Sequence, residues 1–140
     1  MALKVAKQGV DIGIVVTDSA NALAFYRDTL GIPLEETREI ANGGIMHRMR
    51  CGNSLIKLLG YKQPPKHRAP GGTLTSATGF RYITITVTNL NEALAACRAK
   101  GYTIPHEPYD NHKGLIVGAV NDPDGNQVEI VQDSATWRKP

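Results

Sequence analysis

The sequence predicts an α+β fold made of two successive βαβββ units. Three features indicate it: short segments with alternating apolar residues, a helical spacing after the first segment of each half, and a repeat that relates the two halves. At an offset of 71 residues, the first segments match at Ile12/Ile83, Ile14/Ile85 and Val16/Val87. A chain of 140 residues is long enough to form one domain with a buried core.

The first unit is predicted to span about residues 9–60. It opens with a strand over residues 10–16, followed by a helix that Asp18 caps and in which Leu23, Tyr26 and Leu30 recur at helical spacing. The helix ends at Gly31-Ile32-Pro33. Asn-Gly is a strong hairpin signal, and the turns at 42–44 and 51–53 divide the remainder into strands over 34–41, 45–50 and 54–59.

The second unit is predicted to span about residues 80–132. A strand over residues 82–89 leads into a helix containing Ala93-Leu94-Ala95, with Asn89 and Glu92 as a capping box. Strands over 102–109, 114–120 and 127–131 complete the unit. The connecting loop 61–79 is rich in Pro, Gly, Ser and Thr, and residues 133–140 form a C-terminal tail.

A tight turn over residues 122–126 leads directly into the last strand. Asp122 is placed to accept a hydrogen bond from the backbone just beyond it, Pro123 presets φ, and Gly125 accommodates a positive φ. In the strand, Glu129 points to the face opposite the apolar residues. A carboxylate at such a position is a ligand, a catalytic group or one half of an ion pair.

The composition excludes several classes of function. The net charge is +3 with Lys and Arg scattered along the chain, so no nucleic-acid surface is expected. No apolar run reaches the roughly 18 residues of a membrane span, so no membrane partner is expected. Residues 1–7 lack a secretion signal, which favours the cytoplasm. Cys51 and Cys97 fit no zinc or redox motif and are expected to be reduced.

Residues 11–18, 24–31 and 122–129 resemble the vicinal oxygen chelate superfamily, which includes glyoxalase I, bleomycin-resistance proteins and extradiol dioxygenases. The resemblance spans about residues 9–132. It implies a cup-shaped mixed sheet of two βαβββ units, with helices on the outer face and a ligand cavity inside. Metal-dependent members hold their ion at four positions, in the first and last strand of each unit. In this sequence those positions fall on Asp11, Lys57, Tyr82 and Glu129.

The alternation of the strands independently places these four residues opposite the apolar positions. The assignment of Lys57 depends on the register of its strand. Matching Gly52-Asn53 to Gly125-Asn126 would put Ile56 opposite Glu129, and a bulge of one residue would restore Lys57.

Divalent metals take imidazole, thiolate or carboxylate donors, and a protonated lysine is none of these. We therefore expect Lys57 to replace the metal, with Asp11 and Glu129 as its counter-ions and Tyr82 as a hydrogen-bond donor. No metal and no other cofactor is predicted. Either His47 or Arg48 shares the face of Lys57: His47 would supply a general base there, and Arg48 would suit an anionic ligand.

Three functions are compatible with these residues. The first is a metal-independent small-molecule-binding protein of the glyoxalase or bleomycin-resistance type, with a carbonyl or anionic ligand held by Lys57. The second is a metal-free isomerase or lyase in which Glu129 or Asp11 moves a proton and Lys57 stabilises an oxyanion. The third, a metal-dependent glyoxalase-type lyase, needs ligands that the sequence mostly lacks.

The alternative to a catalytic role is a structural ion-pair cluster of Asp11, Lys57 and Glu129 that replaces the metal site, combined with passive ligand binding. The resemblance also implies a homodimer, because cups of this kind are completed either within a chain or across a twofold axis. The connecting loop 61–79 is expected near the mouth of the cavity.

Overall fold

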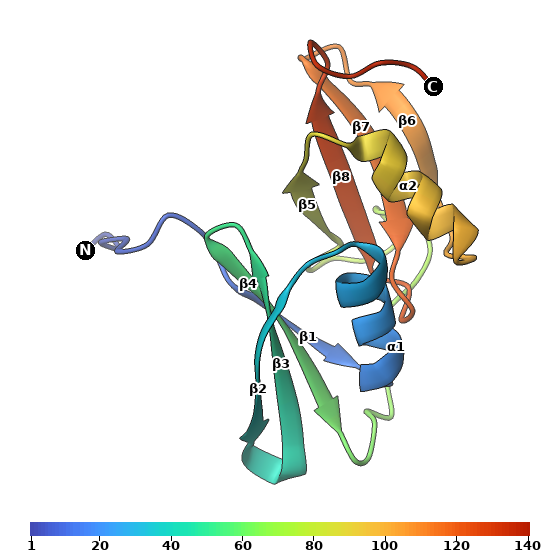
Figure 1. The fold of residues 1–140 in the computed structure, drawn as a ribbon. Coiled ribbons are helices and arrows are strands. Elements are labelled where there is room, and N and C mark those ends of the chain that lie inside the picture. The colour runs from blue at the N-terminus through green and yellow to red at the C-terminus, as the bar shows by residue number, and fades with distance from the viewer. The chain divides into compact units, whose positions relative to one another are not determined.

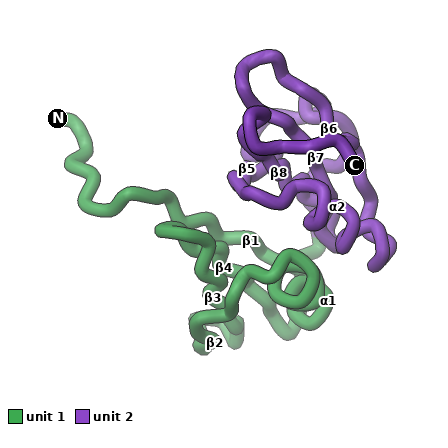
Figure 2. The backbone as a smooth tube through the Cα atoms, turned by 45° about the horizontal axis from the view of Figure 1, so that its top comes forward, with its two compact units in different colours: residues 1–66 green, residues 67–140 purple.

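The computed structural model describes all 140 residues and contains two compact units, residues 1–66 and 67–140 (Figures 1 and 2). The boundary between them falls within the predicted connecting loop. Each unit holds one helical segment and one open four-stranded mixed sheet, which confirms the α+β class and the two βαβββ units. None of the helices combines the length and the apolar character needed to cross a bilayer.

The first unit begins with strand β1 (Ile12–Val16), helix α1 (Ser19–Leu23) and a π-helical continuation, η1 (Ala24–Thr29). It continues with β2 (Leu34–Ile40), a 3-10 turn η2 (Ala41–Gly43), β3 (Gly44–Cys51) and β4 (Ser54–Tyr61). The strand order is β1-β4-β3-β2, in which β1 is parallel to β4 and the other neighbours are antiparallel.

The second unit repeats this arrangement. It contains β5 (Tyr82–Thr86), α2 (Leu90–Ala99), β6 (His106–Asp110), β7 (Leu115–Asn121) and β8 (Gln127–Asp133). The strand order is β5-β8-β7-β6, again with one parallel pair, β5 and β8, and antiparallel neighbours elsewhere. The shared topology confirms the internal repeat that the sequence predicts.

Each helix packs on one face of the sheet in its own unit. In the second unit, a Cβ at Gly118 of β7 would lie 2.7 Å from Leu94 Cδ1, so glycine permits the close approach of α2. In the first unit, a Cβ at Gly60 of β4 would lie 2.1 Å from Ser19 Oγ at the start of α1. The face of β4 that α1 covers therefore contains Gly60 and, by alternation, the fully buried Leu58.

The two helices are capped differently. Asp18 accepts a hydrogen bond from the N–H three residues ahead at 2.8 Å, which confirms it as an N-cap. The predicted capping box is wrong, because Asn89 caps no backbone N–H and its side-chain amide instead donates to Glu92 at 3.4 Å. The Leu90 N–H donates to Gln132 Oε1 of β8 at 3.0 Å. A tertiary contact thus replaces the local cap.

The first helix holds one residue more than the second. The helices begin 71 residues apart, but the positive-φ glycines that follow them, Gly31 and Gly101, are only 70 apart. The π-helical segment absorbs the extra residue, because the Leu30 N–H donates to the Phe25 carbonyl at 2.9 Å in an i to i+5 pattern. Phe25 is fully buried, whereas Leu23 and Leu30 of the predicted apolar stripe are half-buried.

Candidate functional site

One row of residues crosses the first sheet. The strand register pairs Gly13 with Lys57, Lys57 with Arg48, and Arg48 with Glu36. Directly paired residues of neighbouring strands share a face. The row therefore lies on the face opposite the one that carries Leu58 and α1. We call this face the open face of the first sheet.

The equivalent row of the second sheet runs through Thr84, Glu129, Ala119 and His106. Thr84 follows Gly13 by the 71 residues that relate the two first strands, and Thr84 pairs with Glu129 as Gly13 pairs with Lys57. The register thus equates Lys57 with Glu129 and excludes the alternative match of Ile56 to Glu129.

Asp11 lies immediately before β1, where it contacts three groups. Its Oδ1 accepts hydrogen bonds from the Leu55 N–H at 2.8 Å and from Lys7 Nζ at 2.5 Å, and its Oδ2 lies 3.8 Å from Lys57 Nζ. The hydrogen bond from Lys7, followed by that from Leu55, lowers the pKa of the Asp11 carboxyl. Asp11 is therefore an ionised anchor that ties β4 to the start of β1.

Arg48, not His47, shares the open face with Lys57. The Arg48 Nε lies 3.4 Å from Glu36 Oε2, but this buried Nε forms no hydrogen bond. Glu36 instead accepts a short hydrogen bond from Arg38, which is the main reason that the pKa of its carboxyl is lowered. Glu36 is thus committed mainly to Arg38, and Arg48 retains hydrogen-bonding capacity.

His47 points into the core of the first unit. It pairs with Leu58, is 8% exposed, and its Nδ1 lies 3.0 Å from Thr37 Oγ1. Its Nε2 has no hydrogen-bond partner. Burial, and secondarily the charge of Arg27, lowers the pKa of His47. His47 is a neutral core residue, so the alternative in which it acts as a general base beside Lys57 is wrong.

This burial predicts a pH dependence of stability. The pKa of His47 in the folded protein lies below its value in the unfolded chain, near 6.5, so the unfolded state binds more protons as the pH falls. The contribution of neutral His47 is complete above about pH 6.5 and is lost as the pH falls through the folded pKa. Urea unfolding between about pH 7 and pH 5 should show this loss, and His47→Gln should flatten the profile. An unchanged profile in His47→Gln would refute the assignment.

The second unit holds the other two predicted site residues. Thr84 Oγ1 donates to Glu129 Oε1 at 2.8 Å, which fixes the half-buried carboxylate. Tyr82 pairs with Gln127, lies on the same face, and is 48% exposed. Thr84 is absent from the sequence-predicted site, although its alternation with Tyr82 would have placed it there. The structure thus joins Asp11 to Lys57 in one unit and Thr84 to Glu129 in the other.

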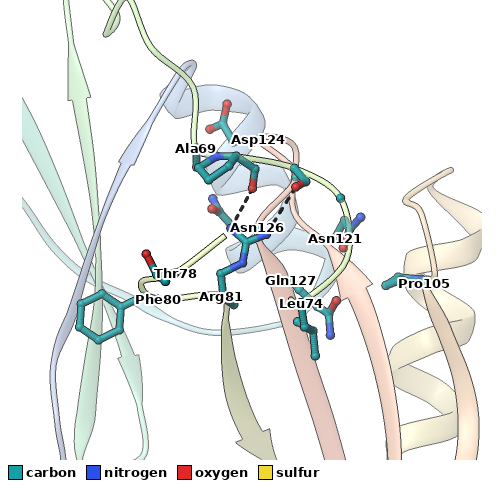
Figure 3. A pocket seen from close by; sticks show the side chains of 14 residues that line it. Ala69, Leu74, Thr78, Phe80, Arg81, Pro105, Asn121, Asp124, Asn126 and Gln127 are labelled. Atoms are coloured by element: carbon teal, nitrogen blue, oxygen red, sulfur yellow. Dashed lines mark hydrogen bonds between the residues drawn. The ribbon is translucent and has the colours of Figure 1, made fainter. Parts of the chain in front are cut away.

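A cavity of about 240 Å³ lies within the second unit, between the connecting loop and the turn before β8 (Figure 3). Arg81 holds the loop in place, because its Nη atoms donate to the carbonyls of Pro70 at 2.9 Å and Thr73 at 3.2 Å. Gln127 lines the cavity and lies one alternation from Glu129, whereas neither Glu129 nor Tyr82 lines it. Within the second unit the loop therefore forms one wall of a cavity whose lining includes Gln127 but neither Tyr82 nor Glu129.

The four positions that the resemblance assigns to a metal do not suit one in this chain. Lys57 supplies a cation instead of a donor, and Asp11 is already bound to Lys7 and the Leu55 N–H. Burial raises the pKa of both thiols, to about 11 for Cys97, so neither Cys51 nor Cys97 is a ready thiolate. In the structure no three His, Cys, Asp or Glu side chains gather as a metal site.

Comparison with known proteins agrees with this architecture. Residues 10–130 match the model of the Glyoxalase/Bleomycin resistance protein/Dioxygenase superfamily. The chain is 29% identical over 134 residues to the uncharacterized protein YaeR of Escherichia coli (strain K12), covering 90% of this chain and 96% of that one. It is 26% identical over 128 residues to a probable lactoylglutathione lyase of Synechocystis sp. (strain ATCC 27184 / PCC 6803 / Kazusa), covering 87% and 92%.

Solved structures show the same fold. A glyoxalase family protein from Bacillus cereus superposes with a TM-score of 0.78 at 18% identity, covering 94% of this chain and 96% of that one. TnmS3, an antibiotic binding protein from Streptomyces sp. CB03234, superposes with a TM-score of 0.67 at 17% identity, covering 96% and 99%. On its sequence match and its two βαβββ units, the chain belongs to the Glyoxalase/Bleomycin resistance protein/Dioxygenase superfamily.

Proposed function

We propose that this protein binds a small molecule without a metal ion, and that Lys57 supplies the positive charge that holds a carbonyl or anionic ligand. The observation that carries the proposal is the register that equates Lys57 with Glu129. At a position where metal-dependent relatives are expected to place a carboxylate, this chain has an ammonium group. TnmS3, a structural neighbour that binds an antibiotic, supports a binding role on this fold.

A metal-free isomerase or lyase is the second candidate, and the hydrogen bond from Thr84 to Glu129 favours it. A hydroxyl that fixes one carboxylate oxygen leaves the other oriented for proton transfer. Asp11 is the weaker candidate for the base, because its hydrogen bonds lower the pKa of its carboxyl. In an enzyme of this kind, Glu129→Gln would abolish turnover and leave ligand affinity nearly unchanged.

We also propose that the protein acts as a homodimer in the cytoplasm. The superfamily resemblance supports the dimer, because related cups are often completed across a twofold axis. Sedimentation equilibrium at micromolar concentration provides the test, and a monomer would contradict the dimer.

Native mass spectrometry of the chain purified from cells tests the ligand-binding role. We expect a bound small molecule on the wild-type chain and a loss of at least about tenfold in its occupancy in Lys57→Met, because a charged contact is removed. Lys62→Met removes the same charge from the exposed connecting loop and serves as the control. Equal occupancy in Lys57→Met and Lys62→Met would contradict the assignment of Lys57.

A further inference from the structure

We infer that Lys57 and Arg48 on the open face of the first sheet bind a small dianion, a doubly charged oxyanion of the phosphate-monoester or dicarboxylate class. This inference rests on the proposed function, because it places the ligand against Lys57. It goes further by naming the charge of the ligand and a second residue that contacts it.

Two cations are directly paired on the open face of the first sheet. Arg48 and Lys57 face each other across β3 and β4, a geometry that brings Cβ atoms to about 4.5–5.5 Å. Like charges at such positions destabilise a sheet. The two side chains are 22% and 30% exposed, so water screens their repulsion only in part. A bound anion would remove that repulsion.

The charges around this pair of cations are not balanced. The two ion-pair clusters that contain Lys57 and Arg48 link four cations to two carboxylates, which leaves a net charge of +2. One cluster is Lys7, Asp11 and Lys57, and the other is Arg48, Glu36 and Arg38. A dianion would neutralise the excess, whereas a monoanion would leave half of it.

Both cations retain hydrogen-bond donors without a partner. The buried Nε of Arg48 forms no hydrogen bond, and Lys57 Nζ lies 3.8 Å from Asp11, beyond hydrogen-bond distance. The planar guanidinium donates several hydrogen bonds in fixed directions, and the ammonium is a compact charge on a flexible side chain. Together they suit an oxyanion with several oxygens.

Lys57 has no side chain opposite it on β1, where a Cβ at Gly13 would lie 3.4 Å from Leu59 Cδ1. Its neighbour on β1 is Gly13, which has no side chain, whereas the equivalent position of the second sheet holds Thr84. In that second sheet the neighbour of Glu129 on β7 is Ala119, so the row carries no cation pair. The anion site is therefore a property of the first unit alone.

Isothermal titration calorimetry tests the inference with inorganic phosphate, malonate and acetate at pH 7.5 and constant ionic strength. We expect one site per chain, with at least one dianion binding about tenfold or more tightly than acetate. Arg48→Met and Lys57→Met should each weaken the preferred dianion by about tenfold or more. The control Lys62→Met should change the affinity by less than about twofold. Tighter binding of phosphate than of malonate would indicate a phosphate site, and tighter binding of malonate a dicarboxylate site.

Arg48→Lys tests whether Arg48→Met loses affinity only because it fails to fold. It keeps the charge and should recover a part of the affinity that Arg48→Met loses, with an unchanged unfolding curve. Acetate binding as tightly as both dianions, or Lys62→Met weakening binding as much as Lys57→Met, would overturn the inference. If neither dianion binds but Lys57→Met still loses the co-purified molecule, the inference fails and the proposed function stands.

Discussion

Replacing Asp122 with alanine is expected to lower the free energy of unfolding of the second unit by about 3–5 kcal/mol. The Asp122 side chain closes the turn that precedes β8, and the residue is only 5% exposed. Its Oδ1 accepts from the N–H groups of Asp124 at 3.0 Å and Asn126 at 2.8 Å, and its Oδ2 accepts from Asn126 Nδ2 at 3.0 Å. Alanine leaves these donors without their charged acceptor.

Urea unfolding followed by the fluorescence of Trp137 measures this loss, because the single tryptophan lies in the second unit and donates to Asn91 at 2.8 Å. Asp110→Ala is the matched control: an exposed carboxylate that accepts one backbone hydrogen bond, from His112 at 2.7 Å. The free energy of unfolding of Asp110→Ala should fall by less than about 1 kcal/mol. An Asp122→Ala variant as stable as the control would show that the turn does not depend on its carboxylate.

Local chemistry made much of the fold predictable. The Asp122 turn is specified within five residues, and Gly125 adopts the predicted positive φ of 86°. Strand alternation is equally local, so the sequence predicts all eight strands and both helices within a few residues. The repeat then fixes the topology, because two units with the same element order bury the same faces.

Features that depend on tertiary contacts could not be predicted from the sequence. The choice between His47 and Arg48 follows from the length of the turn at Gly52-Asn53, since a shift of one residue exchanges the faces of a strand. The cap of α2 comes from Gln132, which is 42 residues away in sequence. A lone threonine on a strand carries no motif, so alternation places Thr84 on the face of Tyr82 but only the strand register reveals its pairing with Glu129.

The second large effect concerns metal affinity. We expect the wild-type chain to bind Zn²⁺, Mn²⁺ and Ni²⁺ no more tightly than about millimolar, several orders of magnitude weaker than a built protein site. The ammonium of Lys57 repels a dication instead of coordinating it, by about 2 kcal/mol at 4 Å in water and more where screening is weaker. Asp11 is already bound to Lys7 and the Leu55 N–H.

Metal content and affinity, measured together on untagged protein purified without chelator, test most directly whether Lys57 has replaced a metal ion. Elemental analysis should find less than about 0.1 metal ion per chain, and competition with a zinc-binding dye should detect no tight site. Stoichiometric metal with submicromolar affinity, lost in Glu129→Gln, would contradict the account.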